Sequence, residues 1–335
     1  MKMKIQIGSV ADSAIAMSND GVARRKETLS CPICGSEQVS PYLSAPDRFH
    51  LRAIPYELVR CGSCCLVWQK NPPRPEEIGQ HYGSDYHKSI TSAGDSSPKR
   101  WALQNRTIAN FKKGGSLLDL GCSAGAFLST MRRDSWQLHG IEISPNEARR
   151  AEERTGAKVF VGDILDAPFA PTSFDVITCF DVLEHLYEPR KIMEKLRVWL
   201  KPGGIFYMAV PNIASWESHL FKGYWFGLEL PRHLFLYSPP SVRKLAEATG
   251  LKELHCSTPP ASYAENSFRY IWDHVLLSLS VSRQPLAVAG DMGLPGRIVR
   301  KGFRITLLDQ YRRLASWCGA GPVLEMILQK PGDLS

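Results

Sequence analysis

The stretch Leu118-Asp119-Leu120-Gly121-Cys122-Ser123-Ala124-Gly125-Ala126-Phe127 decides the fold of this chain. It begins as a buried strand, passes through a turn of small residues and continues into an expected helix over Ala124–Arg133. Glycines let a backbone approach a ligand closely, and a helix N-terminus offers free N–H groups. A turn at the carboxyl end of a parallel strand is where open α/β sheets bind ligands.

Apolar segments of strand length alternate with helical segments on the C-terminal side of this turn. The expected strands are 116–120, 137–143, 157–161, 174–180 and 204–210, and the expected helices between them include 145–155 and 189–200. Such alternation predicts an α/β fold with a doubly wound parallel sheet. Further along, a capped helix is expected over 238–250, and final strands are expected at 251–255 and 323–329.

Three acidic residues stand at the ends of successive expected strands: Asp119, Glu142 and Asp163. Glu142 follows Gly121 by 21 residues, the expected place for a carboxylate that accepts hydrogen bonds from both ribose hydroxyls. Asp163 is placed to bind an adenine amino group beside Ile164. A dinucleotide fingerprint would need glycines at Ser123 and Ala126, and Asp119 suits an ammonium group better than a pyrophosphate.

The segments DLGCSAGAF, GIEIS, GDILDAPF, FDVITCFDVLEHLYEP and LKPGGIFYMAVPN resemble the ordered motifs of class I S-adenosylmethionine-dependent methyltransferases, over roughly 110–255. The resemblance implies a seven-stranded, Rossmann-like sheet with S-adenosyl-L-methionine along its strand ends. Ser123 departs from the family, which usually has glycine there. The cofactor-binding residues implied by the resemblance are Asp119, Gly121, Ser123, Gly125, Glu142, Ile143, Asp163, Ile164 and Phe180.

Methyl transfer from a sulfonium is a displacement in which the protein mainly orients donor and acceptor. A base is needed only where the acceptor must lose a proton. His185, in Asp181-Val182-Leu183-Glu184-His185, is one catalytic candidate, because an ordinary imidazole titrates near neutrality. His233 is the other. Either histidine can instead have the structural role of fixing a loop through backbone hydrogen bonds.

Two C-x-x-C pairs, Cys31/Cys34 and Cys61/Cys64, are separated by 26 residues. Such knuckles are typical of a tetrahedral Zn²⁺ site, and four thiolate ligands leave no open position for chemistry. Redox pairs and packed free cysteines are the alternatives. Cys65 occupies the place after the second knuckle where glycine is usual. The knuckles ahead of a class I core also resemble the sugar C-methyltransferases, which favours a sugar as acceptor.

The composition fits a globular protein: of 335 residues, 44% are hydrophobic and 22% are charged, with a net charge of +8. No secretory signal or spanning segment is evident, so we expect a cytoplasmic protein. Residues 299, 303, 307, 311 and 314 share one helical face, flanked by arginines. This pattern favours peripheral contact of 296–314 with the inner face of the membrane, or a helix packed on the core.

We expect four parts: a flexible N-terminus (1–28), a zinc-binding domain (29–70), a linker with a short helix (71–100) and a methyltransferase domain (101–335) with an insert at about 260–320. The predicted function is methyl transfer to a small-molecule acceptor, such as a sugar, glycan, lipid-linked or natural-product intermediate. An RNA methyltransferase with a guiding zinc ribbon is the alternative. The knuckle region lacks an interleaved basic and aromatic surface, which disfavours nucleic acid as partner. A catalytically inactive cofactor-binding scaffold is a third possibility, against which the intact acids argue.

Overall fold

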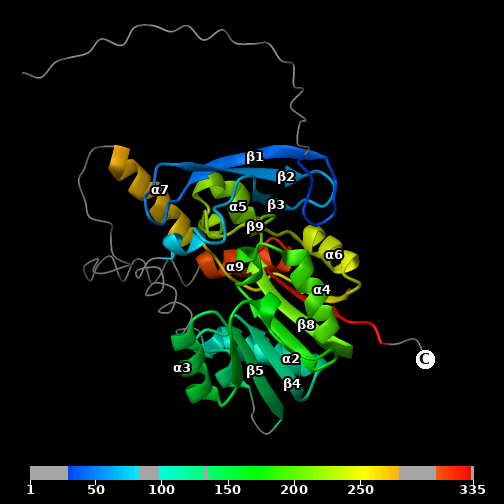
Figure 1. The fold of residues 1–335 in the computed structure, drawn as a ribbon. Coiled ribbons are helices and arrows are strands. Elements are labelled where there is room, and N and C mark those ends of the chain that lie inside the picture. Colours follow the sequence, from blue (N-terminus) through cyan, green and yellow to red (C-terminus); the bar gives the residue numbers. More distant parts are fainter. Residues whose placement is uncertain (1–28, 83–97, 132–134, 279–306, 333–335) are drawn as a thin grey trace, which may run out of the picture.

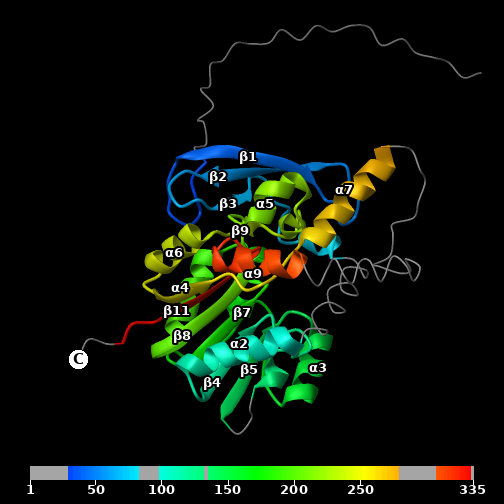
Figure 2. The same cartoon turned by 180° about the vertical axis from the view of Figure 1, so that it is seen from behind.

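The computed structural model describes residues 29–82, 98–131, 135–278 and 307–332. Its strands form a seven-stranded sheet and a four-stranded sheet, and in both views the four-stranded sheet lies on the opposite side of the molecule from β4 and β5 (Figures 1 and 2). The seven-stranded sheet consists, in spatial order, of β10 (Lys252–Ser257), β11 (Val323–Gln329), β8 (Leu200–Pro211), β7 (Phe174–Phe180), β4 (Gly115–Leu120), β5 (Trp136–Glu142) and β6 (Lys158–Val161).

Five strands of this sheet, β4 to β8, pair in parallel, whereas β11 is antiparallel to β8 and β10 is antiparallel to β11. The strand order reverses direction at β4, the strand that leads into the small-residue turn. Open α/β sheets bind ligands at such a switch point, outside the carboxyl ends of the strands. The predicted α/β fold with a seven-stranded, doubly wound sheet is confirmed.

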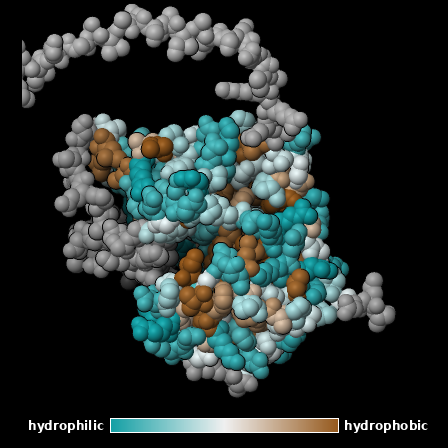
Figure 3. Space-filling view, viewed as in Figure 1, coloured by the Kyte–Doolittle hydropathy of each residue, from teal (hydrophilic) through white to brown (hydrophobic). Residues whose placement is uncertain are grey.

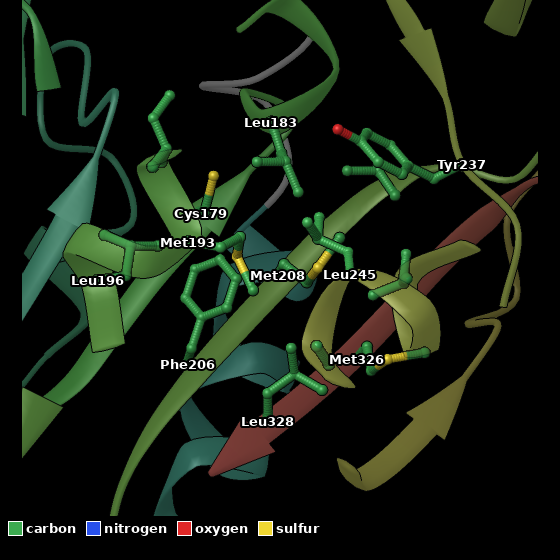
Figure 4. Packing of buried hydrophobic residues seen from close by; sticks show 14 of the residues in the cluster. Cys179, Leu183, Met193, Leu196, Phe206, Met208, Tyr237, Leu245, Met326 and Leu328 are labelled. Atoms are coloured by element: carbon green, nitrogen blue, oxygen red, sulfur yellow. The ribbon is translucent and has the colours of Figure 1, made fainter. Parts of the chain in front are cut away.

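Helices cover both faces of the sheet. On β7, Ile177 and Cys179 pack with α4 (Pro189–Trp199) and α6 (Pro239–Ala248). The alternate residues Val176 and Phe180 pack on the other face, with α2 (Pro98–Phe111) and α3 (Pro145–Thr155). Because side chains alternate along a strand, strands this apolar throughout are buried on both faces. Figure 4 shows the α4 and α6 side, where Met208 of β8 and Met326 of β11 meet Met193 and Leu245.

The turn after β4 differs from the prediction. The expected helix over Ala124–Arg133 is wrong for the described residues, which contain only the single turn η2 (Leu128–Thr130). Backbone φ is +46° at Ser123 and +72° at Gly125, in the left-handed region that a right-handed helix cannot include. The next helix is as predicted: the Ser144 hydroxyl accepts a hydrogen bond from the Glu147 N–H at the start of α3 (3.4 Å).

The four-stranded sheet contains β1 (Val39–Pro46), β2 (Pro55–Cys61), β3 (Val67–Gln69) and β9 (Phe235–Leu236). All neighbours in it are antiparallel, and β9 pairs with β3 through Val67↔Leu236 and Trp68↔Phe235. The N-terminal strands therefore share their sheet with a segment that lies far along the chain. The short helix expected near residues 75–82 is the single turn η1 (Ile78–His81).

Helices from the second half of the chain lie near this sheet: α5 (Trp216–Phe221), η5 (Lys222–Tyr224), η6 (Phe226–Leu228), α7 (Ala264–Ser278) and α9 (Asp309–Trp317). Trp225 and Leu230 are buried in one cluster with Ala45 and Leu58 of the N-terminal strands. Trp225 therefore has a packing role. Residues 1–28 and part of the 260–320 insert lie outside the described residues. No helix within the described ranges is long and apolar enough to cross a membrane.

Candidate functional site at the strand ends

The turn after β4 has no room for larger side chains. A Cβ atom added to Gly121 would lie 2.6 Å from a methyl carbon of Val182, and one added to Gly125 would lie 3.1 Å from the Cα of Ala151 in α3. Both glycines and Ser123 have positive φ. The left-handed conformation at Ser123 explains why glycine suits this position, and it is the strained element of the turn.

Glu142, at the end of β5, joins this turn to the next strand end. Its two carboxylate oxygens accept hydrogen bonds from the backbone N–H groups of Ser123 and Ser144, each at 2.9 Å. The carboxylate thus has a fixed orientation, and each of its oxygens retains a further lone pair. That arrangement fits the predicted bonds to ribose hydroxyls. Ile143, the next residue, has an exposed fraction of 75%, which leaves its side chain available to a ligand.

Asp119 is buried under the turn, at the carboxyl end of β4. One carboxylate oxygen accepts a hydrogen bond from the Thr178 hydroxyl at 2.7 Å. Burial raises the pKa of Asp119 to about 7, and the nearby carboxylate of Glu142 adds to the increase. A positively charged ligand group beside Asp119 would favour the ionised form.

Asp163 and Ile164, after β6, occupy contrasting environments. Asp163 is exposed, and one of its oxygens caps the turn η3 (Ile164–Asp166) by accepting a hydrogen bond from the Leu165 N–H (2.7 Å). Ile164 is buried in the core. The structure therefore places the predicted adenine-binding carboxylate at the surface, directly beside an apolar residue.

Phe180, at the end of β7, belongs to an aromatic cluster that the sequence did not reveal. Its ring packs against Phe127 at 5.0 Å, Tyr207 at 5.1 Å and Trp101 of α2 at 5.9 Å between centroids. Trp101 and its neighbour Arg100 precede the motifs and show no recognisable pattern. Arg100 forms an ion pair with Asp181 at 2.7 Å. This ion pair joins α2 to the residue that directly follows β7.

His185 and His233 come together, although 47 residues separate them: their ring centroids lie 4.7 Å apart. Nδ1 of His185 lies 3.0 Å from both the Tyr82 hydroxyl and the Arg232 carbonyl. Nδ1 of His233 lies 2.9 Å from the Gly227 carbonyl, so it carries the proton and Nε2 keeps the lone pair. Burial lowers the pKa of His185 to about 3 and lowers the pKa of His233 as well.

Two carboxyl groups lie next to Nε2 of His233. Glu229 is 3.7 Å away and Glu184 is 4.0 Å away. Burial raises the pKa of Glu184 well above its ordinary value, and the charge of Asp181 acts in the same direction. Within the described residues, neither oxygen of Glu184 has a hydrogen-bond partner. The sequence analysis singled out the histidines only. Glu229 lies four residues before His233, whereas Glu184 meets His233 through the fold.

The four cysteines of the two knuckles form a compact cluster. The Sγ atoms of Cys31 and Cys64 are 3.5 Å apart, those of Cys34 and Cys61 are 3.6 Å apart, and all four lie within 4.8 Å of one another. Sulfur ligands about 2.3 Å from a tetrahedral zinc ion would be about 3.8 Å apart, so this cluster fits the ion. None of the four takes part in a disulfide bond.

Backbone geometry around the cysteines is also that of metal knuckles. The N–H groups of Ser63 and Cys64 point to Sγ of Cys61, each at 3.4 Å. Gly35 and Cys65 follow the two knuckles, with φ of +72° and +62°. Cys65 thus adopts the conformation usual for glycine at this place, and it lies outside the cluster of four sulfur atoms.

Comparison with known proteins identifies a methyltransferase domain in the central region. Residues 99–255 match a family model described as a methyltransferase domain. The ubiquinone biosynthesis O-methyltransferase of Idiomarina loihiensis is 27% identical over 166 residues, which cover 45% of this chain and 67% of that protein. The enzyme of the same name from Paraburkholderia phymatum is 30% identical over 151 residues, 41% of this chain and 65% of that protein. The chain thus spans about two thirds of the length of these relatives.

Among solved structures, an S-adenosylmethionine-dependent methyltransferase from Archaeoglobus fulgidus aligns with a TM-score of 0.49 and 15% identity, over 73% of this chain and all of that chain. The strand order and the family match establish the class of the central region: the chain carries a methyltransferase domain of the S-adenosylmethionine-dependent class.

Proposed function

We propose that this chain transfers a methyl group from S-adenosylmethionine to a small-molecule acceptor held next to His185 and His233. The observation that carries the proposal is the arrangement of Asp119 and Glu142 at the ends of the adjacent strands β4 and β5. His185 follows β7, on the other side of β4, and the His233 ring packs against it. The cofactor, when bound, supplies a methyl group already activated by its sulfonium. The chain's own residues hold the cofactor, orient the acceptor and accept a proton.

His233 is the better placed of the two bases. Its Nδ1–H is fixed on the Gly227 carbonyl, so Nε2 can take a proton from an acceptor hydroxyl or acidic carbon. Burial keeps the ring neutral at pH 7, and the carboxylate of Glu229 would stabilise the imidazolium that forms. Nδ1 of His185 already contacts the Arg232 carbonyl and the Tyr82 hydroxyl. This residue is therefore suited to hold the His233 ring in place.

A sugar, glycan, lipid-linked or natural-product intermediate is the acceptor class that we propose. The ubiquinone biosynthesis O-methyltransferases among the relatives act, by name, in the synthesis of a small molecule, which supports an acceptor of this size. We further propose that the cysteine cluster holds one Zn²⁺, through Cys31, Cys34, Cys61 and Cys64, in a structural role.

The acceptor class is tested by incubating the protein with methyl-labelled S-adenosylmethionine and three cell fractions: soluble metabolites, extracted lipids and RNA. We expect label in the metabolite or lipid fraction. Label in RNA, with binding that weakens steeply as salt increases, would instead support the RNA methyltransferase alternative. Label in no fraction would contradict the proposed activity.

We also propose peripheral membrane contact through 296–314. Residues 296–306 lie outside the described residues. In the described part of this segment, Leu307 and Leu314 of the predicted stripe have exposed fractions of 56% and 51%. Tyr311 of the same predicted stripe packs instead against Trp216, at 6.5 Å between ring centroids. Figure 3 shows apolar side chains at the surface of the nearby α7, whose Phe268 and Trp272 have exposed fractions of 61% and 59%.

In a flotation assay, the protein should rise with vesicles that contain anionic lipid at low salt, because exposed aromatic and aliphatic groups next to arginines favour such an interface. Leu314→Ser should reduce the floated fraction severalfold, whereas Val161→Ser, which changes an exposed apolar residue on β6, should not. Absence of flotation with anionic vesicles would leave α9 as a helix packed on the core.

A further inference from the structure

The side chain of Gln69, at the end of β3, holds the loop that carries His233. Its Nε2 donates hydrogen bonds to the backbone carbonyls of Pro231 (2.8 Å) and His233 (2.7 Å). The backbone N–H of Gln69 donates to the Leu234 carbonyl (3.0 Å), which extends the pairing of β3 with β9. Gln69 is only 2% exposed. Among uncharged side chains, only an amide NH₂ offers two donors on one nitrogen, so a neutral residue that serves two carbonyls here must be an amide.

A buried ion pair holds the same loop from a second direction. Arg232 is fully buried, and its guanidinium lies 3.5 Å from the carboxylate of Asp47, which is also fully buried. The guanidinium also donates to the His81 carbonyl (3.2 Å) and lies 3.3 Å from Glu229. Asp47 directly follows β1 and His81 ends η1, so both partners on this side come from the N-terminal part of the chain.

The N-terminal part also contacts the other histidine. The Tyr82 hydroxyl lies 3.0 Å from Nδ1 of His185, and the backbone carbonyl of Arg232 lies at the same distance from that nitrogen. Three residues of the N-terminal segment, Asp47, Gln69 and Tyr82, therefore act on the two imidazoles through the loop or directly. The cysteine knuckles border the same sheet, since Cys61 is the last residue of β2.

We propose that Asp47, Gln69 and Tyr82 are positioning residues for His185 and His233, so that the N-terminal sheet forms part of the acceptor site. That the acceptor lies beside the two rings rests on the proposed function. The positioning of the rings does not depend on it, because it concerns only hydrogen bonds and ring geometry. Gln69 makes the sharpest test, since its side chain acts on the loop by two hydrogen bonds and carries no charge.

The test follows the ring signals of the two histidines by NMR in the full chain with ¹⁵N-labelled histidine, assigned through His185→Gln and His233→Gln. Gln69→Leu puts an apolar side chain of similar size in place of the amide and so removes both donors. We expect the His233 ring signals to shift and to titrate between pH 5 and 7, as Glu184, Glu229 and Arg232 rearrange around a loosened loop. Affinity for S-adenosylmethionine should stay within twofold, because Gln69 is not among the predicted cofactor-binding residues.

Two further variants complete the test. At low pH, the histidine ring signals of Gln69→Glu should resemble those of the wild type, because the protonated acid donates one hydrogen bond. At high pH they should resemble those of Gln69→Leu, because the carboxylate repels the two carbonyls. This pH-dependent change can be measured even if Gln69→Leu does not fold. Val39→Ala weakens the same sheet on its edge strand β1, which β2 and β3 separate from β9, and should leave both rings unchanged.

Unchanged ring signals in a folded Gln69→Leu protein would overturn the proposal. Equal shifts in Val39→Ala would also overturn it, because they would show general loosening of the sheet rather than positioning by Gln69. Failure of the wild type to bind S-adenosylmethionine would count against the proposed function alone, since the histidine signals can be measured without the cofactor.

Discussion

Replacing Cys61 by serine is expected to remove the zinc ion and unfold the N-terminal sheet. Cys61 is fully buried at the end of β2 and receives two backbone N–H groups, and its sulfur is one of the four in the cluster. Structural zinc in small domains contributes about 10–16 kcal/mol of apparent binding free energy, coupled to folding. A serine hydroxyl is a poor substitute for a thiolate ligand, so most of that stabilisation should be lost.

Elemental analysis of purified protein and thermal unfolding measure this effect. The wild type and Cys65→Ser should each hold one zinc ion per chain, because Cys65 lies outside the four-sulfur cluster. Cys61→Ser should hold none and should lose protection of β1–β3 against proteolysis. A wild-type protein that is free of metal and still has an intact N-terminal sheet would refute the zinc assignment.

Replacing His233 by glutamine is expected to reduce the rate of methyl transfer to the acceptor identified from cell fractions by about 10²–10⁴-fold, the usual contribution of a general base. The wild-type rate should be constant around pH 7 and fall only below the ordinary histidine pKa of about 6.5, because burial lowers the pKa of His233 and the base must be unprotonated. His185→Gln should reduce the rate less, since its Nδ1 is engaged by backbone and Tyr82.

The His233→Gln experiment distinguishes catalysis from binding when the affinity for S-adenosylmethionine is measured in parallel. That affinity should be unchanged, since His233 is not among the predicted cofactor-binding residues. A His233→Gln protein that transfers methyl groups within twofold of the wild-type rate would show that no base is needed at this position.

Local patterns in the sequence were sufficient to predict the central fold. The strand Phe174–Phe180 has the predicted bounds, and Ser144 and Pro145 begin α3 as their residue types indicate. These features depend on apolar runs, caps and turns, which are properties of neighbouring residues. The helix expected at Ala124–Arg133 was wrong because left-handed backbone at Ser123 and Gly125 prevents an early helical turn, a constraint that composition alone does not display.

The site was predictable where its residues form motifs and hidden where they meet through the fold. Spacing brought out the cysteine pairs, and strand-end positions brought out Asp119 and Glu142. Gln69 and Tyr82 carry no motif, and each contacts its partner across more than 100 residues of chain. Their roles depend on the pairing of β9 with the N-terminal sheet. A strand of only two residues, Phe235–Leu236, is too short to be predicted from the sequence pattern.

Calorimetric titration of S-adenosylmethionine into the wild type and Glu142→Ala tests the central claim most directly. The wild type should bind, about tenfold more weakly at pH 6 than at pH 7.5, because Asp119, with its pKa raised to about 7, must lose a proton to pair with the ligand's ammonium. Glu142→Ala should lose roughly 1–3 kcal/mol of binding free energy, whereas Glu153→Ala, on the exposed side of α3, should bind normally. A wild type that does not bind, or a Glu142→Ala protein with unchanged affinity, would contradict the account.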